Sequence, residues 1–102
     1  MVNDVLWVDD VRNPINPAGI DIARTYEQAI ALLTKQNYRV LFIDHDLGCF
    51  DASSREWTGY DVVLWLAERK DNGFAVPTEY RILTSNPAGR QRITGVIERY
   101  LL

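Results

Sequence analysis

Two short apolar runs in this sequence each end in acidic residues. The run VLWV at residues 5–8 leads into Asp9 and Asp10, and the run VLFI at residues 40–43 leads into Asp44. Such runs are typical of buried strands in a parallel sheet, and open α/β sheets bind ligands at the carboxyl ends of their strands. Because clustered carboxylates repel one another, Asp9, Asp10 and Asp44 are predicted to hold a divalent cation, Mg²⁺ or Mn²⁺.

His45 is the only histidine in the chain, and it lies between Asp44 and Asp46. Flanked by two carboxylates, it is a candidate proton carrier, which makes Asp44, His45 and Asp46 the candidate catalytic residues. Neighbouring side chains of an extended segment point to opposite faces, so His45 could instead turn away from the site and have a structural role. Both interpretations remain open at the level of sequence.

A phosphate-binding role is predicted for four residues near these acids. Arg12 follows the acid pair by two positions and can bind phosphate oxygens through two parallel hydrogen bonds. Thr84, Ser85 and Asn86 end the last predicted strand and open a helix, with Asn86 as N-cap and Pro87 at the first helical position. Free amides at such a helix N-terminus bind anions.

Hydrophobic periodicity predicts the elements that position these residues. A capping box, Thr25 with Gln28, starts the first helix, and a polar segment at 49–56 is predicted as a loop over the acidic site, beside Trp57 as a candidate for stacking on a base. Strands are predicted at 4–8, 20–23, 40–43 and 80–83, and helices at 25–37, from 58 to about 70–73, and from 87 onward.

The second strand, residues 20–23, follows a loop of only nine residues at 11–19. Parallel strands usually need a longer crossover, but nine extended residues span up to ~30 Å and could return the chain without a helix. The strand can therefore pair in parallel or form an antiparallel edge strand, and the sequence leaves both arrangements open.

Size and charge limit the classes of function. The 102 residues are expected to form one domain, residues 1–102, and the net charge of −3 argues against binding to duplex DNA or a membrane through bulk charge. No apolar run suits a transmembrane helix and no signal peptide is evident, so a cytoplasmic location is expected. The single Cys49 lacks a second thiol for a disulfide or a metal site.

Several of these segments together resemble a known family, the cyclic-phosphate processing receiver domain, and more broadly the receiver domains of response regulators. The resemblance implies a compact receiver-like α/β fold, flavodoxin-like but truncated, as a three-layer sandwich around a mainly parallel four-stranded sheet. It also implies that the acidic cluster, Arg12, His45 and Asn86 act on a phosphate ester. The matching segments are Asp9-Asp10-Val11-Arg12-Asn13-Pro14, Asp44-His45-Asp46-Leu47-Gly48, Thr58-Gly59, and Asn86-Pro87 near Gly89.

Two departures from the receiver pattern affect the expected function. A signalling receiver has a fifth strand ending in a lysine that contacts the phosphoryl group, whereas the last element predicted here is the helix after Asn86. The family also tends to place a histidine where this chain has Leu83. Classical phosphotransfer signalling is therefore not expected.

The expected function is metal-dependent binding, and hydrolysis, of a cyclic phosphate or other phosphate ester. The expected ligand is a phosphorylated small molecule, a cyclic nucleotide or an RNA end. The alternative is a non-catalytic receiver-like module that binds a protein partner or sequesters a nucleotide. Turnover of a cyclic phosphate would separate the two.

Overall fold

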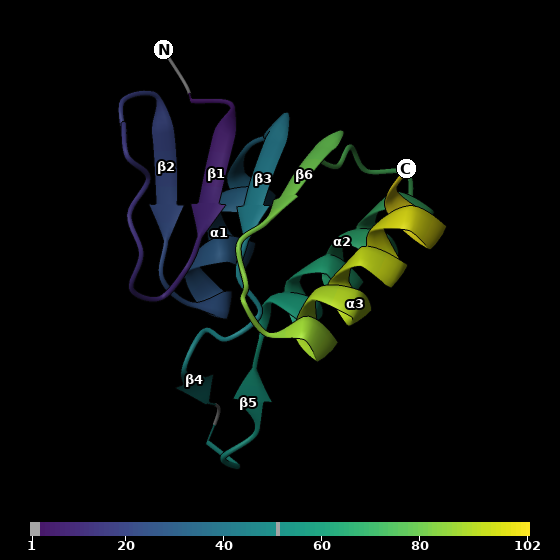
Figure 1. Ribbon diagram of the computed structural model, residues 1–102. Helices are drawn as coiled ribbons and strands as arrows, with labels where there is room; N and C mark the ends of the chain where they lie inside the picture. The colour runs from purple at the N-terminus through teal and green to yellow at the C-terminus, as the bar shows by residue number, and fades with distance from the viewer. Residues whose placement is uncertain (1–2, 51) are drawn as a thin grey trace.

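The computed structural model describes residues 3–50 and 52–102, except for the side chain of Cys49. Four parallel strands form the main sheet in the order β2-β1-β3-β6 (Figure 1). Of the two arrangements that the sequence left open for the second strand, the structure has the parallel one, in which Val5 pairs with Ile20 and Val8 pairs with Ala23. The strands are β1 (Val5–Val8), β2 (Ile20–Ala23), β3 (Val40–Ile43) and β6 (Glu79–Ile82).

Three helices follow the strands, and the last of them continues into a π-helical turn, η1. The three helices are α1 (Tyr26–Lys35), α2 (Gly59–Asp71) and α3 (Pro87–Val96), and the π-helical turn η1 covers Ile97–Leu101. Within residues 3–50 and 52–102, no helix combines the length and apolar character needed to cross a bilayer.

The start of α1 agrees with its predicted cap, with one difference. The Thr25 hydroxyl accepts a hydrogen bond from the Gln28 amide at 3.1 Å, as predicted. The Gln28 side chain, however, accepts from the amide of Arg24 at 2.7 Å and not from that of Thr25. The helix ends at Lys35, before the predicted end at Asn37, because the Gln36 backbone is already extended.

The helices lie on one side of the sheet. Leu6, Val8, Leu41 and Ile43 point to that side and are fully buried in the core. Figure 1 shows α1 behind the strands and α2 beyond β6, with α3 in front of α2, and no helix of the described residues crosses the front of the sheet.

The predicted receiver-like class and parallel four-stranded sheet are confirmed. The molecule has one layer of strands and one layer of helices, however, and not the predicted three-layer sandwich. The reason is topological. β1 connects to β2 by a loop, and the two helical crossovers, β2 to β3 and β3 to β6, both move in the same direction along the sheet. Right-handed crossovers in one direction place both helices on the same face.

The segment between β3 and α2 contains a short hairpin where a loop was predicted. Its strands are β4 (Cys49–Phe50) and β5 (Glu56–Trp57), and they pair antiparallel. Strands of two residues are too short for a detectable alternation of polar and apolar residues, so the sequence pattern missed them. Residue 51 of the predicted loop lies outside the described residues.

Candidate functional site

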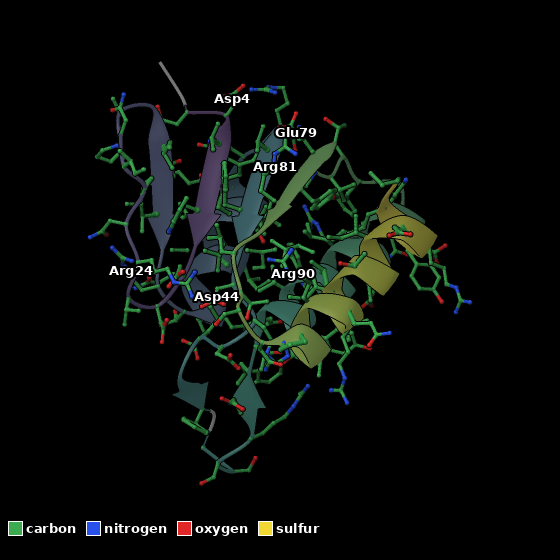
Figure 2. The ribbon with its side chains drawn as sticks, in the orientation of Figure 1. Asp4, Arg24, Asp44, Glu79, Arg81 and Arg90 are labelled. Carbon is green, nitrogen blue, oxygen red and sulfur yellow. The ribbon has the colours of Figure 1, made fainter. Side chains whose placement is uncertain are left out.

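The sheet brings the predicted acids to one edge, because its hydrogen-bond ladder continues just past the strands. The Asp44 amide donates to the Val8 carbonyl at 2.9 Å, and the Asp9 amide donates to the Ala23 carbonyl at 3.2 Å. Asp9 and Asp44 therefore leave neighbouring parallel strands at the same level. Figure 2 shows Asp44 at the carboxyl ends of the strands.

Three carboxylates form a compact cluster at this edge. Asp9, Asp10 and Asp44 each offer an oxygen, and these atoms lie within 4.8 Å of one another. Asp9 is fully buried, and its Oδ1 accepts hydrogen bonds from the amides of Val11 and Arg12, both at 3.0 Å. Its Oδ2 has no hydrogen-bond partner among the described residues, and Arg12 Nε forms an ion pair with it at 3.6 Å, beyond hydrogen-bond distance.

Asp44 is the carboxylate whose ionisation is most perturbed. Burial raises the pKa of Asp44, and the nearby Asp9 carboxylate raises it further. Hydrogen bonds from the His45 amide, at 2.8 Å, and from the Thr84 hydroxyl oppose this rise, as does the charge of Arg12. The net effect is that the folded protein disfavours the charged form of Asp44.

Arg12 and Arg90 both bind the end of β6. Arg12 Nη1 donates to the Leu83 carbonyl at 2.7 Å, and Arg90 Nη2 donates to the carbonyls of Ile82 and Thr84, both at 3.1 Å. About half of the Arg12 side chain remains exposed beside the acidic cluster. Arg12 is therefore at the predicted place, and it is tied to the strand that carries the predicted phosphate-binding residues.

Arg24 is a site residue that the sequence did not reveal. Its Nη1 donates to the carbonyls of Asp9 at 3.1 Å and Arg12 at 2.6 Å, and its Nη2 donates to Asn13 Oδ1. In Figure 2, Arg24 and Arg90 lie to either side of Asp44. The available signal was its place directly after β2, at the same edge of the sheet as the acids.

Thr84, Ser85 and Asn86 connect β6 to α3 as predicted. Thr84 is buried, and its hydroxyl accepts from the Asn86 amide at 3.1 Å while bonding to Asp44. Asn86 is the N-cap of α3, with its Oδ1 accepting from the Gly89 amide at 3.1 Å. Ser85 is exposed. The structure thus places Thr84 against the acidic cluster and Asn86 at the helix N-terminus beside it.

His45 and Asp46 pair with each other outside the carboxylate cluster. His45 Nδ1 lies 2.9 Å from Asp46 Oδ1. The ring packs on the first turn of α3, where a Cβ atom on Gly89 would come within 2.5 Å of His45 Cγ. Among the described residues, the group close enough to share a cation consists of Asp9, Asp10 and Asp44 without His45.

Gly59, at the start of α2, packs against the backbone of the segment that carries Asp44. A Cβ atom on Gly59 would lie 1.9 Å from the Asp44 carbonyl oxygen, and the Gly59 amide donates to the His45 carbonyl at 2.8 Å. The first turn of α2 therefore lies directly against the segment that carries Asp44. A side chain at this position would force the two segments apart.

Trp57, predicted as a stacking residue, is part of an aromatic group near the N-terminus of α1. It stacks on Tyr26 with ring centroids 4.5 Å apart, and the guanidinium of Arg55 lies 3.9 Å from the centroid of its ring. Stacking on a nucleic-acid base stays a prediction.

Known proteins were compared with the chain in three ways. Residues 5–99 match the family described as the cyclic-phosphate processing receiver domain. No curated protein matches the chain. A solved structure, the yeast Spc42 trimeric coiled coil of amino acids 181–211 fused to another structure, is similar with a TM-score of 0.63 and 21% identity. The match covers 94% of this chain and 63% of that protein, and at this identity it shows the fold alone.

Proposed function

Since the chain belongs to the cyclic-phosphate processing receiver family, we propose that it binds a divalent cation and a phosphate ester at the acidic cluster and hydrolyses that ester. The substrate class is a cyclic phosphate or related ester, as on a nucleotide or an RNA end. The observation that carries the proposal is the fully buried Asp9 carboxylate, which clusters with Asp10 and Asp44 and whose Oδ2 has no hydrogen-bond partner among the described residues.

A divalent cation suits this cluster on chemical grounds. The three donors are carboxylate oxygens, the ligands that Mg²⁺ and Mn²⁺ prefer, and three ligands leave coordination positions for substrate and water. Asp9, Asp10 and Asp44 would hold the ion, and the unpartnered Asp9 Oδ2 would gain a ligand bond. With the ion bound, the site has a Lewis acid that neutralises charge on a phosphoryl oxygen.

The protein's own groups would orient the phosphate. The N-terminus of α3 lies on one side of the cluster, beside Thr84, where the positive end of the helix dipole favours an anion. Arg12 supplies a half-exposed guanidinium on the β6 side. A phosphate between these groups and the carboxylate cluster would be held on several sides.

His45 is the proposed proton carrier, with Asp46 as the residue that orients it. When Nδ1 carries the ring proton and donates a hydrogen bond to Asp46, Nε2 is the unprotonated, basic nitrogen. The contact with Gly89 fixes the ring against α3. This role needs a proton path, direct or through water, from the substrate to Nε2.

The test is turnover of cyclic phosphates. Nucleoside 2′,3′-cyclic and 3′,5′-cyclic phosphates are incubated with the protein and Mg²⁺ or Mn²⁺, and ring-opened product is measured by chromatography. We expect product that disappears with EDTA and falls by at least two orders of magnitude in Asp44→Asn, the range typical for loss of an essential catalytic interaction.

The exposed Asp71→Asn, at the end of α2, is the control variant and should keep wild-type turnover. Circular dichroism checks that both variants are folded. Metal-dependent binding without turnover of any cyclic phosphate would support the non-catalytic receiver-like module instead.

A further inference from the structure

A small pocket of about 210 Å³ opens between the β4–β5 hairpin and the first turn of α1. Its lining consists of Thr25, Tyr26, Glu27, Phe50 and Trp57. A larger hollow of about 650 Å³ is lined by residues of α2, α3 and η1 and includes none of the acidic cluster. The smaller pocket is the one whose lining segments adjoin residues at the acidic cluster.

The chain connects this pocket to the acidic cluster on two sides. A Cβ atom on Gly48 would lie 3.4 Å from Asp10 Oδ2, and Phe50 is two residues further on, at most about 7.6 Å away between Cα atoms. On the other side, Arg24 donates to the Asp9 carbonyl and directly precedes Thr25. Both segments that line the pocket thus extend from residues at the acidic cluster.

One wall of the pocket is already ordered by stacking and hydrogen bonds. Trp57 lies between Tyr26 and the guanidinium of Arg55. Arg55 in turn donates to Asp61 Oδ1 at 2.9 Å, and Asp61 Oδ2 accepts from the amide of Thr58 at the start of α2. The hairpin is therefore anchored to α2, and the aromatic wall exists without a ligand.

The size and lining of the pocket favour a flat ring with N–H groups. Pockets for drug-sized ligands are about 300–1,000 Å³, so 210 Å³ suits a single ring system. Phe50 keeps 61% of its surface exposed at the rim, where an aromatic residue can cover a planar ligand. Glu27, an exposed residue of the lining, has a carboxylate side chain that can accept two parallel hydrogen bonds.

We propose that this pocket binds the base of a nucleoside phosphate, with guanine preferred, while the phosphate lies at the acidic cluster. The inference rests on the proposed function of that cluster. Guanine presents two adjacent N–H donors, at N1 and N2, that match the two oxygens of the Glu27 carboxylate. Adenine has an amino group without a neighbouring N–H donor, so it satisfies this carboxylate less well.

Calorimetric titration in Mg²⁺ tests the base pocket, with guanosine 5′-monophosphate, adenosine 5′-monophosphate, ribose 5-phosphate and guanosine as ligands. We expect guanosine monophosphate to bind at least tenfold more tightly than ribose 5-phosphate. Phe50→Ala should weaken the ligands that carry a base, by roughly five- to 150-fold, the usual effect of removing one stacking aromatic residue, and should leave ribose 5-phosphate unaffected. Glu27→Gln, an exposed substitution compatible with folding, should remove the preference over adenosine monophosphate.

Two matched variants serve as controls. Phe74→Ala removes another exposed aromatic residue, one that lies against Arg69, and Glu98→Gln neutralises an exposed acid of η1. Both should bind guanosine monophosphate as the wild type does.

The outcomes separate the two proposals. Equal affinities for guanosine monophosphate and ribose 5-phosphate, both metal-dependent, would overturn the base pocket and leave the phosphate site standing. Guanosine binding as tightly as its monophosphate, unaffected by EDTA or Asp44→Asn, would support the pocket and overturn the proposed function. Equal affinity for both nucleotides would overturn the guanine preference.

Discussion

The Asp9 carboxylate shows how much the site depends on individual residues. It is fully buried, yet one of its oxygens finds no hydrogen-bond partner in the described part of the chain, and an unsatisfied buried polar atom costs about 1–3 kcal/mol. Asp10 and Asp44 add further negative charge within 4.8 Å. Without a cation the folded state therefore contains an unfavourable electrostatic arrangement, which a bound ion would relieve.

The first prediction concerns metal and thermal stability. Mg²⁺ or Mn²⁺ should raise the melting temperature, because an ion that binds only the native state stabilises it, by about 2.7 kcal/mol at a hundredfold excess over Kd. Asp9→Asn and Asp44→Asn should abolish the rise. Differential scanning calorimetry with and without EDTA provides the measurement.

Asp4→Asn is the matched control for this prediction. Asp4 lies just before β1, at the opposite edge of the sheet (Figure 2), where it pairs with Arg39 at 3.1 Å. Its substitution should leave the metal-induced shift intact. A wild-type melting curve that ignores both ions would refute the cation site.

The second prediction concerns pH in the metal-free protein. Burial and Asp9 raise the folded-state pKa of Asp44 above the unfolded value of about 3.9. The native state therefore binds more protons between these two values, and the stability that Asp44 contributes is lost as pH rises through the folded pKa. Asp44→Asn should stabilise the metal-free protein at neutral pH and reduce this pH dependence.

Urea unfolding in EDTA, from about pH 4 to pH 8, measures the effect of Asp44. Asp71→Asn, exposed at the end of α2, should leave the pH profile unchanged. If Asp44→Asn instead destabilises the metal-free protein at neutral pH, the ionised Asp44 carboxylate is favoured by the fold and the stated direction of the pKa shift is wrong.

Residue types predicted part of this site because acids after apolar runs are visible in the sequence. Asp9, Asp10 and Asp44 follow strands, and parallel pairing made their convergence predictable. Arg24 was not predictable in the same way, since its partners are mainly backbone carbonyls that only the folded loop brings together. The direction of the His45 ring depended on its contact with Gly89, 44 positions away in the sequence.

At the scale of elements, the N-terminus of α3 combines a structural and a possible binding role. Asn86 caps the helix through the Gly89 amide, and the Asn86 amide donates to Thr84, which bonds to Asp44. The cap and the acidic cluster are thus two hydrogen bonds apart. Substitutions of Asn86 can separate the two roles.

The third prediction compares two substitutions of this cap. Asn86→Ala should cost about 1 kcal/mol of stability through loss of the capping oxygen and should also weaken binding of inorganic phosphate in Mg²⁺. Asn86→Ser keeps a capping oxygen but shortens the side chain, so it should preserve stability and still weaken binding. Thermal melts and calorimetric titration measure the two effects, and unchanged affinity in both variants would reduce Asn86 to a helix cap.

Longer elements were predictable from periodicity, whereas contacts between their ends were not. The apolar stripe of α1 and the cap at Thr25 gave the helix start correctly. The hairpin was missed because two-residue strands carry no periodic signal. The function of Gly59 also needed the structure, since only the docking of α2 on Asp44 leaves no room for a side chain.

For the whole molecule, the positions of the lysines distinguish this fold from a signalling receiver. The chain has two lysines, Lys35 and Lys70, and both lie in the last turns of helices. Helices of parallel crossovers run antiparallel to the strands, so these turns lie at the edge of the sheet opposite the acidic cluster. Neither lysine is placed to contact a phosphoryl group on Asp44.

The fourth prediction follows from this arrangement. Incubation with acetyl phosphate and Mg²⁺ should leave Asp44 without a stable acyl phosphate, because neither lysine is held beside it. Intact-protein mass spectrometry provides the measurement. A phosphate adduct that is lost in Asp44→Asn would restore the signalling interpretation.

The layering of the molecule was the least predictable level. Apolar runs such as residues 5–8 suggest a strand covered on both sides, yet the structure covers only the side of Leu6 and Val8. The direction of each crossover decides which face a helix covers, and crossover direction is not encoded in the pattern of any single strand. The alternation of strands and helices along the chain therefore predicted the parallel α/β fold class but not the number of layers.

Trp7, on the open face of the sheet, gives the site an intrinsic optical reporter. Its indole packs against Phe42, and its Nε1 donates to the carbonyl of Arg12 at 3.1 Å. The emission of an indole depends on its hydrogen bond and its exposure to water, so movement of Arg12 toward a ligand would change the emission spectrum. With Trp57 and Trp65 replaced by Phe, the occupancy of the acidic edge becomes readable by fluorescence without an attached dye.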